Sequence, residues 1–153
     1  HNAAQFAMNT WAELPIEAFD QLFRLNVRAP FLLTQRLLPM LIERRGQIVF
    51  INSTAGVVAN ANVGAYAASK HALKAMADSL RAEVNPLGVR VISVYPGRTA
   101  TPMQAQVFAL EGRSYTPDRL MQPEDVARMT VAALALPRSA EVSDLYLQSM
   151  QRA

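Results

Sequence analysis

Apolar residues recur at intervals of three and four positions over the first third of the chain, which is the spacing of one face of an α-helix. The pattern predicts a long helix that starts near Pro15 and ends at Gly46, because proline is tolerated in a first turn and glycine is favoured just beyond a last one. Pro30 has no amide hydrogen for the helical ladder, so we expect the helix to kink or split near its middle. Pro39 predicts a second interruption for the same reason.

Shorter runs of apolar and β-branched residues alternate with further helical patterns after Gly46. Residues 53–64 are expected to form a loop. We expect buried strands over 47–52, 89–94 and 142–147, helices over 65–84 and 123–136, and a partly helical segment over 102–116. Strands that alternate with helices in units of this length indicate an α/β fold with a parallel sheet.

The helix expected over residues 65–84 has two stripes that are suited to packing. The stripe that should contact the sheet is apolar and consists of Leu73, Met76, Ala77, Leu80 and Val84. The other stripe is built of small residues, namely Ala68, Ala72, Ala75, Ser79 and Ala82. A helix that is apolar over much of its circumference is normally buried on more than one side. The small-residue stripe is therefore expected to pack either against neighbouring elements of the same chain or against a second subunit.

Composition limits the classes of protein that are compatible with the chain. Its 153 residues, 51% of them hydrophobic, are enough to bury the core of one globular domain. The net charge of +3 comes from scattered basic residues, which argues against a nucleic-acid partner. No apolar run approaches the roughly 20 residues of a membrane helix, so no membrane partner is expected. With no cysteine and two histidines, the sequence offers no metal site of these residues, and it favours a cytoplasmic location.

Two groups with useful chemistry stand four residues apart, Tyr66 and Lys70 in the segment YAASK. On a helix their side chains share one face, with Cβ atoms about 5–6 Å apart. A cation favours the phenolate, so we expect Lys70 to lower the pKa of Tyr66; a change from about 10 to about 7 needs about 4 kcal/mol. Ser53 follows one expected strand and Pro96-Gly97 follows the next. These residues should meet at the carboxyl edge of the sheet, where parallel sheets bind ligands.

The same residues belong to a longer ordered pattern. Its elements, in chain order, are the opening His1-Asn2-Ala3-Ala4, Asn26 on the long helix, Ser53 after the next strand, Tyr66-x-x-x-Lys70 thirteen residues later, and Pro96-Gly97. In this order and spacing the chain resembles the short-chain dehydrogenase/reductase family, in its non-extended branch. The resemblance implies a Rossmann-like, doubly wound parallel sheet. Residues 1–153 would be a single domain, the catalytic C-terminal portion of that fold, without its first βαβαβ half.

The resemblance also implies roles for individual residues. Tyr66 would protonate a carbonyl oxygen during reduction, or accept the proton in reverse, while Lys70 would lower its pKa and bind the nicotinamide ribose. Ser53 would donate a hydrogen bond to the substrate oxygen, and the backbone of Asn26 would hold a water that links Lys70 to solvent. The catalytic residues would thus be Asn26, Ser53, Tyr66 and Lys70. The cofactor-binding residues would be Asn2, Ala3, Ala4, Tyr66, Lys70, Pro96, Gly97, Thr99 and Thr101.

One part of the family pattern has no counterpart here, the glycine-rich turn Thr-Gly-x-x-x-Gly-x-Gly. The chain has six glycines, and they are too widely spaced to form it. In the family this turn belongs to the half that grips the pyrophosphate and selects the ribose form. The sequence therefore leaves both NAD and NADP open as the cofactor, with NADP slightly favoured.

The expected activity is the interconversion of a secondary alcohol and a ketone or aldehyde, by an enzyme that associates as a homodimer or homotetramer. The substrate would be a small molecule covered by residues 98–120, an apolar lid that contains Met103, Val107, Phe108 and Leu110. The alternative is a fold-related protein without catalysis, which binds or regulates, or an inactive truncated fragment. The complete set of motif residues argues for the enzyme, and the missing glycine-rich turn argues for the alternative.

Overall fold

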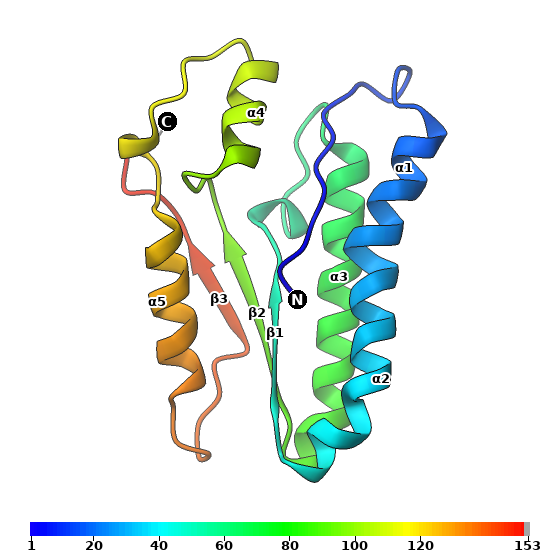
Figure 1. The fold of residues 1–153 in the computed structure, drawn as a ribbon, viewed down its shortest axis with the longest axis vertical. Helices are drawn as coiled ribbons and strands as arrows, with labels where there is room; N and C mark the ends of the chain where they lie inside the picture. The colour runs from blue at the N-terminus through cyan, green and yellow to red at the C-terminus, as the bar shows by residue number, and fades with distance from the viewer. Residues whose placement is uncertain (152–153) are drawn as a thin grey trace.

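Three parallel strands form one sheet in the computed structural model, which describes residues 1–151 of the chain (Figure 1). In chain order they are β1 (Gln47–Ile51), β2 (Arg90–Pro96) and β3 (Asp144–Leu147). The spatial order is β1-β2-β3, and the register pairs Val49 with Ile92 and Val94 with Leu145. The parallel α/β sheet predicted from the sequence is confirmed, with strand boundaries shifted by up to two residues.

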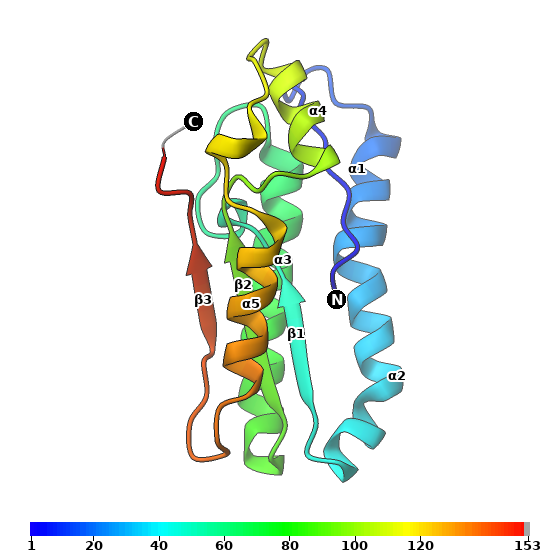
Figure 2. The same ribbon diagram turned by 60° about the vertical axis from the view of Figure 1, so that its left-hand side comes forward.

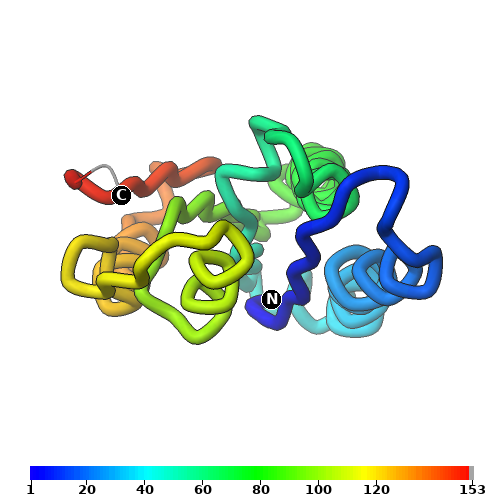
Figure 3. Tube along the Cα trace, turned by 90° about the horizontal axis from the view of Figure 1, so that it is seen from above, coloured from blue at the N-terminus to red at the C-terminus, as the bar shows by residue number. Residues whose placement is uncertain are grey.

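Helices flank the sheet and stand over its carboxyl edge. They are α1 (Ile16–Phe23), α2 (Ala29–Glu43), α3 (Gly64–Val84), α4 (Pro102–Leu110) and α5 (Pro123–Leu134). In Figure 2, β1 and β3 mark the two edges of the sheet, and α2 lies outside β1. Seen from above, α3 and α5 lie on opposite sides of the sheet (Figure 3). The carboxyl ends of the strands point toward α4, and this end of the molecule holds the candidate site (Figure 1).

The long helix predicted between Pro15 and Gly46 is divided into α1 and α2 by the π-helical segment Arg24–Arg28. Pro30 follows that segment and has no amide hydrogen, so the carbonyl of Asn26 loses its usual helical donor and a wider turn accommodates the loss. The expected split near Pro30 is therefore confirmed.

Pro39 does not interrupt α2, so the second predicted break is wrong. The missing amide hydrogen of Pro39 would have bonded the carbonyl of Gln35. Both residues are exposed, so water can take the place of that bond. A proline on the solvent side of a helix therefore destabilises the helix less than a proline on the buried side.

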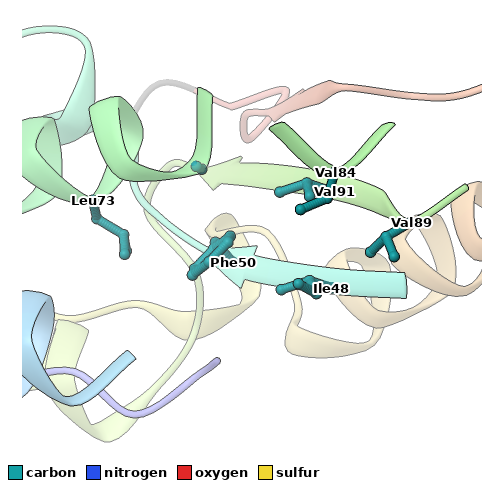
Figure 4. Close-up of a cluster of buried hydrophobic side chains, with 7 residues drawn as sticks. Ile48, Phe50, Leu73, Val84, Val89 and Val91 are labelled. Carbon is teal, nitrogen blue, oxygen red and sulfur yellow. The ribbon is translucent and has the colours of Figure 1, made fainter. Parts of the chain in front are cut away.

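One cluster of buried apolar side chains lies between the sheet and α3. Its buried members are Ile48, Phe50, Leu73, Ala77, Val84, Val89 and Val91 (Figure 4). On the α5 side a second cluster is centred on Ile92 and Val94 of β2 and includes Ala133 of α5. Successive side chains of β2 thus alternate between two apolar clusters, which explains why this strand is apolar along most of its length.

The small-residue stripe of α3 is not covered within residues 1–151. Ala68, Ala75, Ser79 and Ala82 are exposed, and Ala72 is half-buried. Packing of this stripe against the described elements of the same chain, one of the two alternatives, is therefore wrong. Contact with a second subunit stays a prediction.

The start of the chain runs beside the outer edge of β1. The backbone nitrogen of His1 donates to the carbonyl of Val49 at 2.8 Å, and the carbonyl of His1 accepts from the amide of Ile51 at 2.9 Å. The ring of His1 stacks on that of Phe50, with 4.9 Å between centroids. This pairing directs the residues that follow His1 toward the carboxyl end of the sheet.

Candidate active site

A cavity of about 810 Å³ lies at the carboxyl edge of the sheet. Its walls come from the start of the chain, the loops after β1 and β2, the first turns of α3, α4 and the start of α5. The residues predicted from the sequence that line it are Asn2, Ala4, Ser53, Tyr66, Lys70, Pro96, Gly97, Thr99 and Thr101. Two predicted residues, Asn26 and Ala3, do not line it. The motifs after two neighbouring strands therefore converge in space, as their positions in the sequence predict.

Ser53 and Tyr66 lie on either side of the loop that joins β1 to α3. The Ser53 Oγ accepts a hydrogen bond from the amide of Ala55 at 3.1 Å, which fixes the serine directly after the strand. Tyr66, in the first turn of α3, is buried, and its ring packs edge-to-face with that of Phe6, with 4.9 Å between the ring centroids. Burial raises the pKa of Tyr66, and a hydrogen bond with Ser53 lowers it in part. The two hydroxyl groups are thus close together at one wall of the cavity.

Lys70 lies one helical turn beyond Tyr66 and is only 2% exposed. Its Nζ donates to the carbonyl of Ile51 at 3.1 Å and stands 5.9 Å from the centre of the Tyr66 ring. Burial lowers the pKa of Lys70 to about 8, so the side chain remains mostly protonated at neutral pH. An ammonium has three donors, and within residues 1–151 this one uses a single donor. Two donors are left for a ligand in the cavity.

The predicted effect of Lys70 on Tyr66 is wrong for the chain as the structure describes it. The pKa of Tyr66 was expected to fall; burial raises it instead, and the group that opposes the rise is Ser53. The ammonium of Lys70 is bound to the end of β1 and lies almost 6 Å from the ring centre. At that distance its attraction does not offset the desolvation of a buried phenolate.

Asn26 is buried in the π-helical segment, away from the cavity. Its side-chain oxygen accepts from the amide of Gln5 at 2.8 Å, and its side-chain nitrogen donates to the carbonyl of Gln5 at 2.9 Å and to the Ser69 Oγ at 3.0 Å. Ser69 in turn donates to the carbonyl of Tyr66 at 2.7 Å. The side chain of Asn26 therefore ties the start of the chain to the turn of α3 that carries Tyr66.

The loop after β2 brings the remaining predicted residues to the cavity. The amide of Gly97 donates to the carbonyl of Leu147 at 2.8 Å, and the hydroxyl of Thr99 donates to the carbonyl of Gly97 at 3.1 Å. The Thr101 hydroxyl caps α4 by accepting from the amide of Gln104 at 3.2 Å. Each of these bonds restrains the backbone of the loop at the cavity wall.

Sequence reasoning missed the support behind Lys70. Asn52 is 4% exposed, and its side-chain amide donates to the carbonyl of Lys70 at 3.1 Å. Gly56 leaves room for this contact, because a Cβ there would lie 2.6 Å from the Asn52 Oδ1 and 3.0 Å from the carbonyl oxygen of Lys70. A polar residue such as Asn52 at the end of an apolar strand can be noticed in the sequence. Its hydrogen-bond partner, the carbonyl of Lys70, cannot, because the contact depends on how α3 packs against the strand.

α4 lies within the predicted lid of residues 98–120, and the residues that face the cavity differ in part from those expected. Met103 and Val107 line it as expected. Phe108 is buried outside it and Leu110 is 60% exposed, so their expected contribution to the lining is wrong. Arg98 and Glu111, which the sequence analysis did not single out, line the cavity beside them.

None of the helices within residues 1–151 has the length and apolar character that a bilayer crossing needs. Over the same residues, no three His, Cys, Asp or Glu side chains lie close enough to hold a metal ion.

Comparison with known proteins identifies the family. A family model described as short chain dehydrogenase matches residues 1–112. The 1-deoxy-11-beta-hydroxypentalenate dehydrogenase of Streptomyces exfoliatus is 38% identical over 82% of this chain and 46% of that protein. Cyclopentanol dehydrogenase of Comamonas testosteroni is 34% identical over 71% of this chain and 44% of its own length. A short chain dehydrogenase structure from Escherichia coli CFT073, complexed with NADPH, has 32% identity and a TM-score of 0.85 over 95% of this chain and 60% of that one.

The chain belongs to the short-chain dehydrogenase family, and its sheet and helices have the Rossmann-like arrangement of these structures. The resemblance inferred from the motifs is confirmed. The chain spans about half the length of the curated relatives it matches.

Proposed function

We propose that this member of the short-chain dehydrogenase family is part of an NAD(P)-dependent oxidoreductase that interconverts a secondary alcohol and a ketone or aldehyde. The observation that carries the proposal is the convergence of Ser53, Tyr66 and Lys70 on one cavity at the carboxyl edge of the sheet. Relatives named as dehydrogenases of hydroxypentalenate and of cyclopentanol support the alcohol as the reacting group.

A nicotinamide cofactor supplies or accepts the hydride when it is bound. The residues present fit such a group, because Lys70 keeps two donors free in the cavity, and Asn2, Ala4 and the loop 96–101 line the same space. NADP is slightly favoured over NAD, since two structural neighbours are complexed with NADPH or NADP and one relative is named as NADPH-dependent.

The protein residues move the proton. In the reduction direction Tyr66 transfers its phenolic proton to the carbonyl oxygen as the hydride reaches the carbonyl carbon, and the alcohol results. Ser53 donates a hydrogen bond to that oxygen and stabilises the negative charge that develops on it. Lys70 stabilises the phenolate left on Tyr66. In the oxidation direction the alcohol proton returns to Tyr66 while the hydride leaves the carbon.

In this proposal Asn26 does not contact the substrate and instead positions Tyr66. Its amide holds the turn of α3 that carries Tyr66, through the hydroxyl of Ser69. The water that the resemblance places at its backbone stays a prediction, as do the homodimer or homotetramer and the cytoplasmic location.

Replacement of Tyr66 by Phe in the protein expressed from its complete gene tests the proposal. Loss of the proton donor should reduce kcat by about 10²–10⁴-fold, while the affinity for NADPH, measured by fluorescence titration, stays unchanged. The matched control is Tyr146→Phe, which removes a hydroxyl from a side chain that is 52% exposed and outside the cavity. Turnover by Tyr66→Phe at the wild-type rate would refute the assignment.

The second candidate is a non-catalytic, fold-related protein that binds or regulates, or an inactive fragment. Titration of the complete protein with NADH and NADPH separates the two. Binding of neither cofactor at millimolar concentration supports the second candidate, and micromolar binding of either supports the oxidoreductase.

A further inference from the structure

We propose that Glu111 determines which substrates enter the cavity: it neutralises Arg98 there and so restricts the site to uncharged, apolar alcohols and ketones. This inference rests on the proposed oxidoreductase function and names the substrate class of the same site. It starts from the two charged residues that sequence reasoning missed.

Arg98 and Glu111 form a two-pronged ion pair at the cavity wall. Arg98 directly follows Gly97 in the loop after β2, and Glu111 directly follows α4. The two terminal nitrogens of Arg98 donate to the two carboxylate oxygens of Glu111 at 2.9 and 2.6 Å. Such a fork is the strongest arrangement of these two groups and occupies the face of Arg98 that would otherwise bind a carboxylate or phosphate.

The pair is held in place from its outer side. The ring of Phe108, 3% exposed, has the guanidinium carbon of Arg98 at 4.9 Å and that of Arg113 at 5.2 Å from its centroid. Arg113 also donates to a carboxylate oxygen of Glu111 at 3.3 Å, from a position that does not line the cavity. The Glu111 side chain is 19% exposed, and its hydrogen bond with Arg98 lowers its pKa. Glu111 therefore keeps its charge at neutral pH.

Arg98 and Glu111 are paired with each other, so neither is free to bind a charged group of the substrate. Among the described residues that line the cavity, the charged ones are Lys70, Arg98 and Glu111. Lys70 is buried beside Tyr66, and in the proposed function its two free donors bind the cofactor, while the charges of Arg98 and Glu111 neutralise each other. An anionic substrate would lose its hydration without gaining a partner, which is costly in a cavity of this kind.

The remaining walls suit an apolar skeleton. The large apolar side chains that line the cavity are Phe6, Met8, Ile51, Val63, Met103, Val107, Val126 and Val131. They come from the start of the chain, the end of β1, the loop before α3, α4 and α5, so they surround the hydroxyl groups of Ser53 and Tyr66 from several directions. A ring or branched hydrocarbon that bears one hydroxyl or keto group matches this lining.

A pair of alcohols of nearly equal size provides the test, 4-isopropylcyclohexanol and 4-hydroxycyclohexanecarboxylate. Binding of each to the complete protein is measured by calorimetry, and kcat/KM is measured with NADP and NAD. We expect the neutral alcohol to be preferred by about 100-fold or more in both measurements, because an apolar pocket rejects an added hydroxyl by about that factor and an unpaired carboxylate costs more to bury. In Glu111→Gln, which leaves Arg98 unpaired, the preference should fall by at least about 10-fold. Arg113→Gln, which keeps the fork, should leave it unchanged.

Equal or tighter binding of the carboxylate by the wild-type protein would overturn the inference, whether or not turnover is seen. An unaltered preference in Glu111→Gln would overturn the role of Glu111. Binding of the neutral alcohol with the expected preference supports the inference even if no cofactor is reduced, and that absence of turnover would count against the proposed function alone.

Discussion

The burial of Lys70 predicts that the protein gains stability as the pH rises above 8. In the folded chain the side chain is 2% exposed and its pKa is lowered from 10.5 to about 8. In the unfolded chain the same lysine keeps its proton up to its ordinary pKa. Between about pH 8 and pH 10.5 the unfolded state therefore binds more protons than the folded state, and the free energy of unfolding increases with pH. Below pH 8 both states are protonated and the cost of the buried ammonium is fully present.

The size of the effect follows from the difference between the two pKa values of Lys70. That difference corresponds to about 3 kcal/mol in total, of which about 2 kcal/mol is gained between pH 7 and pH 10. Tyr66 acts in the opposite sense at higher pH, because burial raises its pKa above 10 and the unfolded chain then releases its proton first. The measurement should therefore end at pH 10.

Urea unfolding, followed by far-UV circular dichroism at pH 7, 8, 9 and 10, measures the gain. The wild-type protein is compared with Lys70→Met, which keeps most of the length and removes the titrating group. The free energy of unfolding of the wild type should rise relative to that of Lys70→Met by about 2 kcal/mol over this range. Lys74→Met is the control, because Lys74 is partly exposed, is paired with Asp78, and has a raised pKa that leaves it protonated throughout. Parallel pH profiles of the wild type and Lys70→Met would refute the reasoning.

Two substitutions test the packing around the site. Gly56→Ala places a Cβ 2.6 Å from the Asn52 Oδ1 and should lower the free energy of unfolding by about 1–3 kcal/mol, measured in urea; Gly112→Ala, with no atom within 4 Å but a φ of +65°, should cost about 1 kcal/mol or less. Asn26→Ala removes three hydrogen bonds of a buried side chain and should lower the free energy of unfolding by about 2–4 kcal/mol. Combined with Ser69→Ala it should cost less than the sum of the two, and simple additivity would show that the two side chains act separately.

The fold could be predicted from the sequence to the extent that each element carries its own pattern. The strands at 47–51 and 90–96 are short and apolar and lie next to glycine or proline, so both were visible in the sequence as buried strands; β2 is buried on both faces, whereas alternate residues of β1 are only partly buried. Proline was a less certain guide. Pro30 marks a real change of helix, whereas Pro39 lies inside a continuous one, and the difference is the exposure of the carbonyl that loses its donor.

The candidate site could be predicted where its residues follow strand ends, and could not where they meet through side chains alone. Ser53, Tyr66 and Lys70 occupy positions that any parallel sheet directs to its carboxyl edge. Arg98 and Glu111 are 13 residues apart, and their contact depends on the length and direction of α4. Charged residues 13 positions apart do not share a helix face or a strand face, so their pairing could not be predicted from the sequence.

The relation between Tyr66 and Lys70 shows why spacing alone does not determine the proton affinity of a buried group. A nearby cation in general favours a phenolate and lowers its pKa, yet the ammonium of Lys70 is bound to the end of β1, and the group that lowers the pKa of Tyr66 is Ser53. Full burial opposes this by up to about 3–5 units, and it affects Lys70 in the opposite sense at the same time. The sequence reveals the first effect, since four residues make one helical turn, but the depth of burial is a property of the folded chain. Because Tyr66 and Lys70 both lie at the cavity wall, a ligand that enters or leaves the cavity changes the pKa of both side chains. Tyr66 can therefore give up its proton only when the bound ligand offsets the desolvation of the phenolate.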